Sequence, residues 1–411
     1  MRTSPVLDKT AGIVLALVLT LVPIVSHAGG LGMAPLAFIL GLMGFFLYFK
    51  INANPLHFSF NFIALVIFLF WLCITAVWSP YRVDDLLTNY IKLFIMGISF
   101  YFAPVVFRHV AEKKQFNMQR FFVHLMFVSV FLVTIDVSTN FKITLFFNPA
   151  SNPDELVYRL IDAEQNLGHA ITVLVLLLAP TTILLKAHFK AWKFLSCLFF
   201  ILILMASFQN NLWIGLIGAI GVGVTSFLAY KFPRVLPKLL LWIAGCTIIL
   251  APLIAFMSSI AIKGDLSHIP GSWEHRLRMW AYCWTIILEN LLSGAGFDAV
   301  RTYDEQWTTR HGLDLTIVSL HPHNMGIHIW TETGFIGALL ALAVIVTSFK
   351  LVDRHVTGSA PDRAIMISGI IIAAILISSF SYGAWQFWWL GSIFFSIGLI
   401  HLVPKTYSSR I

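Results

Sequence analysis

Long apolar runs separated by short polar stretches cover almost the whole chain. A helix needs about 20 mainly apolar residues to cross the roughly 30 Å hydrocarbon core of a membrane. Runs of this length recur from end to end, which predicts an all-α polytopic membrane protein with about 12 transmembrane helices. We place these spans at residues 11–27, 33–49, 58–78, 88–107, 121–138, 168–185, 191–207, 212–230, 236–259, 325–349, 364–380 and 384–403.

The spans leave one long polar segment late in the chain and a shorter one at residues 139–167. We therefore predict a single integrated domain in three parts. An N-terminal transmembrane bundle of about nine spans covers residues 1–259, a polar loop covers 260–324, and about three C-terminal spans cover 325–411. Loops longer than about 15 residues in a compact protein are usually functional or disordered.

Charge supports this class and sets the orientation. Hydrophobic residues form 58% of the chain and charged residues only 11%, whereas soluble domains carry about a quarter charged residues. With a cytoplasmic N-terminus, most Lys and Arg fall on the cytoplasmic side, for example Lys186, Lys190 and Lys193. The loop 260–324 then lies on the opposite side. The net charge of +8 reflects this topology, and we find no nucleic-acid footprint.

The N-terminus allows a second interpretation. Arg2, Lys9, an apolar stretch and Ser26–Ala28 resemble a cleavable signal peptide. Cleavage would leave every later span on the same side, and we favour a retained first span. Of four cysteines only Cys283 lies outside the spans, so no disulfide framework is implied.

Tryptophans, arginines and histidines gather in the loop 260–324, which makes it the candidate site. Within it, Ser272–Leu292 is predicted to form an amphipathic helix near the membrane surface, with Ser272 as N-cap and Glu274 in the first turn. Its apolar stripe comprises Trp273, Leu277, Trp280, Trp284, Ile287 and Leu291. With 100° of rotation per residue along the helix, Arg276 is the arginine that lies beside this stripe.

Arg276 points to the apolar, membrane-facing side, and its guanidinium matches the oxygens of a lipid-linked phosphate. The alternative is an interfacial arginine that contacts bulk headgroups. Arg278 points away and can pair with Glu274 on the surface. A turn at Gly294 and Gly296 can bring Arg301 back as a second phosphate ligand, although such a glycine pair is most often only a turn.

Two shorter stretches add weaker candidates for the same surface. Tyr158–Ala170 contains Arg159 and His169, and Trp78–Lys92 contains Arg82. Snorkelling and loop solvation account for these charges as well, so Arg159 and Arg82 rank below Arg276.

The stretch "SLHPHNMGIHIWTETGFIG" joins this loop to the next span. Pro322 disfavours helix at His321, and Asn324 can cap a helix that begins at Met325. His323 then lies at a helix N-terminus, where the dipole disfavours imidazolium. A neutral imidazole is what a general base requires. The alternative is an interfacial histidine without a role.

A zinc site with His321, His323, His328 and Glu332 as ligands is a more specific alternative to the general base. The spacing argues against it, because a proline-defined break separates the two pairs and no Cys or Asp completes a common ligand set. We instead expect Glu332 to pair with His328 one turn earlier and to hold the helix start. Behind it lies a small-residue face for helix packing, formed by Gly334, Gly337, Ala338 and Ala341.

The motif His-[Asn/Ser/Gln], nine residues, Gly-x-x-Gly is met by His323, Asn324, Gly334 and Gly337. This resembles the O-antigen ligase and polymerase family of bacterial inner-membrane glycosyltransferases. "HRLRMW…ILENLLSGAGFD", "WSPYRVDDLL" and the "W-x-E-x-G" of residues 330–334 are similar to other stretches of that family. One position departs, because Asn210 in "ASFQNNLW" stands where the family often has an arginine.

The resemblance implies a multi-pass enzyme of the bacterial inner membrane whose active site faces the periplasm. Its donor is an undecaprenyl-diphosphate-linked glycan, and its acceptor is a hydroxyl of lipid A–core. His323 would be the base, and Arg276, with Arg301 and a further cation such as Arg159, would stabilise the departing diphosphate. Displacement would invert the anomeric carbon, and the activated donor requires neither metal nor another cofactor.

Alternatives remain within and outside the family. A growing glycan as acceptor would make the protein a repeat-unit polymerase, and a protein acceptor would make it an O-oligosaccharyltransferase. A transporter or flippase for lipid-linked sugars is the rival from another class. It predicts mid-membrane charges and internal symmetry, whereas here the polar residues cluster at one surface.

Overall fold

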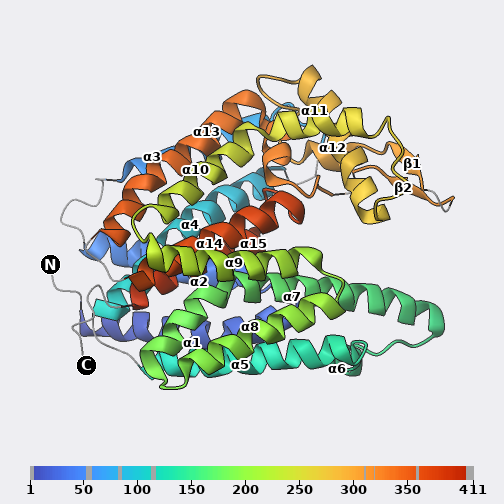
Figure 1. Cartoon of the computed structure of the whole chain (residues 1–411). Coiled ribbons are helices and arrows are strands. Elements are labelled where there is room, and N and C mark those ends of the chain that lie inside the picture. The colour runs from blue at the N-terminus through green and yellow to red at the C-terminus, as the bar shows by residue number, and fades with distance from the viewer. Residues whose placement is uncertain are drawn as a thin grey trace.

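The computed structural model describes residues 4–51, 58–81, 86–112, 117–309, 312–318, 320–357 and 361–403, and only the backbone of residues 86–90 and 117. Figure 1 shows that this part of the chain is built of helices, which confirms an all-α polytopic protein apart from one small hairpin. The first half contains α1 (Pro5–His27), α2 (Met33–Ile51), α3 (Phe60–Thr75), α4 (Leu86–Glu112), α5 (Asn117–Ser138), α6 (Lys142–Phe147), α7 (Pro153–His188), α8 (Trp192–Gln209) and α9 (Trp213–Lys231). The second half contains α10 (Leu236–Ile249), α11 (Ala251–Ala261), α12 (Gly271–Glu289), η1 (Ala299–Thr302), β1 (Gln306–Thr308), β2 (Asp314–Thr316), α13 (Met325–Val356), α14 (Pro361–Phe380), α15 (Phe387–Leu399) and η2 (Ile400–Leu402).

Nine helices of the described residues are long and apolar enough to cross a membrane, and the bent pair α10 and α11 makes a tenth. Two shorter apolar helices remain, α3 and the α15–η2 unit. The total of twelve spans requires both of these to cross as well, so it stays a prediction.

The expected single span at 236–259 is broken at Leu250, where α10 and α11 meet at a bend of 53°. Pro252 stands in the first turn of α11 and has no N–H to donate to the carbonyl of Ile248. The indole of Trp330 donates to that carbonyl instead, at 2.8 Å. The break therefore leaves no orphaned acceptor at this point and ties α10 to α13.

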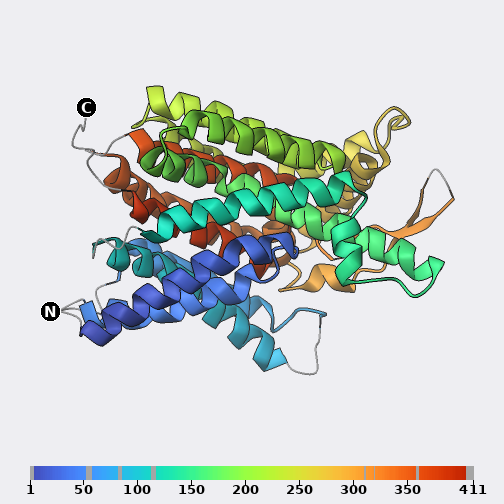
Figure 2. The ribbon, with the colours of Figure 1, turned by 90° about the horizontal axis from the view of Figure 1, so that it is seen from below.

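The expected loop at 139–167 is largely helical, because α7 begins at Pro153. Asn152 caps it by accepting a hydrogen bond from the backbone N–H of Glu155 at 2.8 Å. With 36 residues, α7 is about 54 Å long at 1.5 Å per residue, well beyond the thickness of a hydrocarbon core. Its first turns and α6 project past the bundle (Figure 2).

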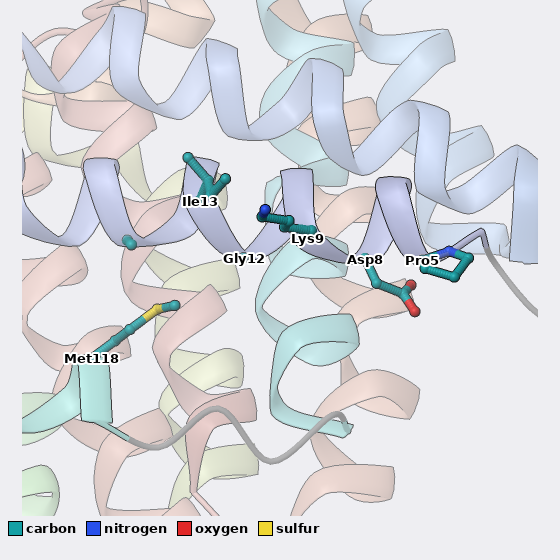
Figure 3. Close-up of a pocket in the computed structure, with 7 residues that line it drawn as sticks. Pro5, Asp8, Lys9, Gly12, Ile13 and Met118 are labelled. Atoms are coloured by element: carbon teal, nitrogen blue, oxygen red, sulfur yellow. The ribbon is translucent and has the colours of Figure 1, made fainter.

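The late loop folds into a small lobe at the same end of the bundle. Here α12 packs on α11 and α13, and the antiparallel hairpin β1–β2 projects outward (Figures 1 and 2). The opposite end, where α1 begins, carries a groove of about 410 Å³ between α1 and α5 (Figure 3). Asp8 in this groove contacts His109 Nε2 at 2.8 Å. The groove is thus remote from the lobe that carries the candidate residues.

Candidate active site

The start of α13 forms as the sequence predicts. The helix begins at Met325, and Asn324 is its N-cap, accepting a hydrogen bond from the backbone N–H of Ile327 at 2.9 Å. His323, directly before the cap, has a left-handed backbone with φ of +49°. The histidine therefore stands on a sharp turn, with the rigid start of a helix behind it.

Three successive carbonyls at the C-terminal end of α14 bind the motif residues. The last carbonyls of a helix have no partner within it. Asn324 Nδ2 donates to Ser379 O at 3.0 Å, and Arg276 Nε donates to Phe380 O at 3.2 Å. His323 Nδ1 lies 2.6 Å from Ser381 O. One helix end thus brings together the two predicted catalytic side chains, His323 and Arg276, from separate parts of the chain.

The contact with Ser381 fixes the tautomer of His323. A carbonyl oxygen only accepts, so Nδ1 carries the proton and Nε2 keeps its lone pair. Among the described residues no group binds Nε2. Burial lowers the pKa of His323 to about 4, with Arg276 and His275 acting in the same direction and the Ser381 carbonyl opposing them. The imidazole is neutral at pH 7, as predicted, but burial rather than the helix dipole is the largest cause.

Arg276 is half-buried and held from two sides. Besides the Phe380 contact, Nη1 donates to Ser272 O at 3.0 Å, and the guanidinium lies 5.6 Å from the ring centre of Trp273. Burial lowers the pKa of Arg276, yet arginine remains charged at neutral pH because its ordinary pKa exceeds 12. A fixed positive charge therefore lies beside a neutral base.

The apolar stripe of α12 faces protein rather than lipid, which corrects the expected orientation. Trp280 and Ile287 are buried in a core shared with α11 and α13. The indole of Trp280 donates to Pro322 O at 2.7 Å and so supports the histidine turn directly. The helix begins at Gly271 after Pro270, so Ser272 is not its N-cap.

Arg278 and Glu274 form their predicted pair, at 2.9 Å, but not on the open surface. Glu274 is buried, and the guanidinium of Arg278 lies over the ring of Trp307 in β1 at 4.7 Å. This pair attaches the hairpin to α12.

Glu332 is fully buried and ties two loops to α13. Its carboxylate accepts hydrogen bonds from the backbone N–H groups of Asp298 and Val300, at 2.9 and 3.2 Å, and from the indole of Trp385. His328 Nε2 lies 3.1 Å from Oε1 as a close polar contact that is not aligned as a hydrogen bond. The expected pairing with His328 is thus a minor part of what this carboxylate does.

Gly334 interrupts α13 instead of contributing to a smooth packing face, which corrects a second expectation. Its φ of +63° and ψ of −163° break the helix. Residues 291–296 cross α13 at this break. The backbone N–H groups of residues 295 and 296 donate to the carbonyls of residues 331 and 332, and the N–H groups of residues 335 and 336 donate to the carbonyls of residues 291 and 292. A Cβ on Gly294 would lie 2.2 Å from the carbonyl carbon of Glu332. Both glycines are required because two backbones touch here.

The other stretches quoted for the family resemblance meet at this crossing. Trp78 donates through its indole to Gly294 O at 3.0 Å, and Ser79 Oγ donates to Phe297 O at 2.7 Å. Gly337 is buried one turn beyond the break, where the indole of Trp71 donates to Thr333 O. The separate sequence stretches thus form one framework behind His323.

The loop Ser381–Gln386 was missed by sequence reasoning, which treated residues 381–383 as a short gap and placed residues 384–386 inside the last span, whereas α15 begins at Phe387. Ala384 N–H donates to His328 Nδ1 at 3.0 Å, and the amide of Gln386 lies 2.8 Å from His321 Nε2. Ser381 and Trp385 bind His323 and Glu332, as described above. The available signal was a run of polar and aromatic residues, "SYGAWQ", between two apolar helices.

The predicted phosphate ligands are only partly brought together. Arg301 follows the crossing loop, and its Nε donates to Asp298 at 3.0 Å. It is close enough to His321 to contribute to the lowered pKa of that ring. Arg159 lies on the projecting part of α7, where it pairs with Glu155 at 2.9 Å rather than with a residue of the His323 cluster. Arg82 lies outside the described residues.

Asn210, at the position where the family often has an arginine, is buried and turned toward α7. Its Nδ2 donates to Glu164 O at 3.1 Å. Among the described residues, no group of three or more His, Cys, Asp or Glu side chains converges in a way that could hold a metal. His321 and His328 instead direct ring nitrogens to backbone N–H groups, those of His323 and Ala384.

Comparison with known proteins adds independent support for the family. Residues 195–342 match the family described as O-antigen ligase, a range that includes α12, the crossing loop and the whole His323 motif. A Rickettsia typhi protein named "Putative polysaccharide ligase" is 30% identical over 139 residues, and its Rickettsia conorii counterpart of the same description is 29% identical over 139 residues. In both cases the similarity covers 33% of this chain and 33% of the relative. No solved structure matches the chain. The resemblance to the O-antigen ligase family is confirmed.

Proposed function

We propose that this protein, which resembles the O-antigen ligase family over residues 195–342, transfers a glycan from undecaprenyl diphosphate to a hydroxyl of lipid A–core. The reaction would take place at the periplasmic face of the bacterial inner membrane. One observation carries the proposal: the Nδ1–H of His323 is bound to Ser381 O beside a fixed Arg276, which leaves a basic Nε2 next to a positive charge.

The proposed step follows from these two groups. The acceptor hydroxyl gives its proton to His323 Nε2 while its oxygen forms a bond to the anomeric carbon of the donor sugar. The bond from that carbon to the diphosphate oxygen breaks, and its electron pair leaves with the diphosphate. Attack opposite the leaving group inverts the anomeric configuration.

Arg276 would stabilise the charge that develops on the departing diphosphate. Preorganised positive groups in a water-poor site commonly provide the largest part of such stabilisation. Arg276 is half-buried and tied to two carbonyls, so little reorganisation is needed. Arg301 is the second candidate ligand, and its neighbour Asp298 would have to release it. Arg159 and Arg82 remain weaker proposals for the same role.

The experiment is complementation of the protein's own host after deletion of the chromosomal gene. The wild-type gene should restore the lipopolysaccharide ladder on a gel, and His323→Ala should not. Core without long glycan, together with accumulated lipid-linked polymer, supports a ligase, whereas core that carries one repeat supports a polymerase. An unchanged ladder with His323→Ala would contradict the catalytic role.

A further inference from the structure

The backbone at His323 is held in a conformation that non-glycine residues rarely adopt. Its φ is +49°, in the left-handed region where a side chain crowds the backbone. The side chain of Asn324 fixes the chain after His323, and the indole of Trp280 fixes the carbonyl of Pro322 before it. Neither of these side chains contacts the backbone of residue 323 itself. The N–H of His323 donates to His321 Nδ1 at 3.3 Å. Among the described residues, the ring of His321 is therefore the group that contacts the backbone of His323 itself.

The ring of His321 is in turn held by Gln386. Its Nε2 lies 2.8 Å from the amide of Gln386, whose Oε1 is buried without a partner. A neutral imidazole cannot accept at both nitrogens. Since Nδ1 of His321 accepts from His323, Nε2 of His321 carries the proton. The Gln386 side-chain amide therefore accepts a hydrogen bond from Nε2 through its oxygen, which requires the amide group to be rotated by 180° so that oxygen and nitrogen exchange places. This arrangement also gives the unpaired Oε1 a partner.

Packing keeps the two rings together. His321 is buried, and its ring centre lies 4.4 Å from that of His323 in an edge-to-face arrangement. A Cβ on Gly383 would approach His321 Cβ to 2.8 Å, so the loop Ser381–Gln386 fits closely against it. The same loop supplies both the carbonyl that binds His323 Nδ1 and the amide that binds His321.

We propose that Gln386 and His321 are positioning residues for His323, in which the Gln386 amide orients His321 and the His321 ring holds the turn that aims His323 Nε2 at the acceptor hydroxyl. This inference rests on the proposed function, since it assigns His323 as the base. His321 itself is no second base, because both of its ring nitrogens are bound within the protein.

The charged state of His321 provides a readout that simple destabilisation would not change. Burial lowers the pKa of His321 to about 2, and the groups that face it reinforce this: His323, His328 on α13, Arg301 beyond the crossing loop, and His169 on α7. Protonation at Nδ1 would remove the acceptor for the His323 N–H. A carboxylate at position 386 favours that protonation.

The test compares Gln386→Glu and Gln386→Leu with the wild type in proteoliposomes that contain undecaprenyl-diphosphate-linked glycan and lipid A–core. Gln386→Leu should lower kcat on the order of 10²-fold, as expected for a misplaced catalytic group, with little change in KM. Gln386→Glu should keep a near-normal kcat at neutral pH. As the pH is lowered, however, this variant should lose activity at a higher pH than the wild type does. Gln209→Leu is the matched control, because Gln209 is exposed on α8 and should leave kcat and the pH profile unchanged.

A second measurement separates this inference from the proposed function. Carbethoxylation of His323 by diethyl pyrocarbonate, followed by mass spectrometry across pH, reports the titration of the ring without any turnover. Burial is the main cause of the low pKa of His323, so release of the turn in Gln386→Leu should expose the ring to water and raise the midpoint of its titration toward the ordinary value of 6.5. An unmoved midpoint together with wild-type kcat would overturn the positioning role even if His323→Ala is inactive. Full activity of His323→Ala would instead overturn the base assignment, while a shifted midpoint would still support the positioning contact.

Discussion

His323 acquires its chemistry from one local and one distant feature. Pro322 and Asn324 define the turn and the helix start locally, and both effects can be read from adjacent residues. The tautomer depends on the carbonyl of Ser381, which the chain places on a different helix end. Sequence reasoning could therefore select His323 and its cap, but not the partner that decides which ring nitrogen carries the proton.

The lowered pKa of His323 predicts the pH dependence of activity. A base works only when it is unprotonated, so kcat/KM should rise as the pH passes upward through about 4 and then stay level to pH 8. Initial rates across pH 3.5–8 with purified protein measure this, and an acid limb centred near 6.5 would contradict the buried neutral ring. The free energy of unfolding should also fall as the pH drops from 6.5, because the unfolded histidine then binds a proton that the folded one does not.

Arg276 and Arg278 on the same helix provide a second test. Arg276→Lys should lower kcat by about 10²-fold or more, the usual effect of losing one preorganised group that stabilises developing charge. Lysine lacks the planar fork that reaches both Phe380 O and Ser272 O.

Arg278→Lys is the control for this substitution, because it makes the same chemical change on the same helix and keeps a cation beside Glu274. Steady-state rates on the same donor and acceptor measure both variants. Equal losses in the two would mean that Arg276 acts only through the fold of α12.

At the scale of elements, the least predictable feature is the crossing of residues 291–296 through the break in α13. Gly334 lies in a run of small residues, and such a run indicates close helix packing as readily as a helix break. The difference depends on Gly294, 40 positions earlier in the chain, whose backbone occupies the space where a Cβ of Gly334 would lie. A local pattern does not contain this information.

A comparison of Gly294→Ala with Gly312→Ala distinguishes the steric effect of the crossing from the cost of a left-handed backbone alone. Both glycines have positive φ, +73° and +75°, but a Cβ on Gly312 would meet no atom of the described residues within 4 Å. Gly312→Ala should cost only about 1–2 kcal/mol, the intrinsic penalty of a left-handed residue.

Gly294→Ala should destabilise the protein several times more, because its Cβ would overlap the backbone at Glu332. Thermal unfolding in detergent, followed by circular dichroism, compares the two variants. Equal melting temperatures would mean that the crossing is looser than the structure indicates.

At the scale of the whole molecule, hydropathy was sufficient for the class and for most helices, because burial in a membrane is determined by composition over about 20 residues. It failed where helices extend past the apolar stretch or bend within it. The first half of α7 is polar enough to pass for a loop, and α10–α11 is apolar enough to pass for one straight span. The α12 stripe was assigned to lipid because a protein core and a bilayer select the same side chains.

The whole bundle predicts on which side of the membrane the site lies. The hairpin β1–β2 lies at the end opposite the start of α1 (Figure 1). His323 belongs to the same lobe, because Trp280 of α12 donates to the carbonyl of its neighbour Pro322. With the positive-inside orientation, Gly312→Cys should react with an impermeant maleimide in cells whose outer membrane is permeabilised, whereas Thr10→Cys should react only after lysis. Labelling of both positions, or of Thr10→Cys alone, would contradict the periplasmic placement.

The central claim is that His323 deprotonates the acceptor hydroxyl during glycan transfer. Its most direct measurement is the initial rate at which purified protein in proteoliposomes transfers glycan from undecaprenyl diphosphate to lipid A–core, for wild type and His323→Ala. General-base catalysis commonly contributes about 10²–10⁴-fold, so His323→Ala should lower kcat by that range with KM little changed. Equal rates for a folded His323→Ala variant would contradict the account.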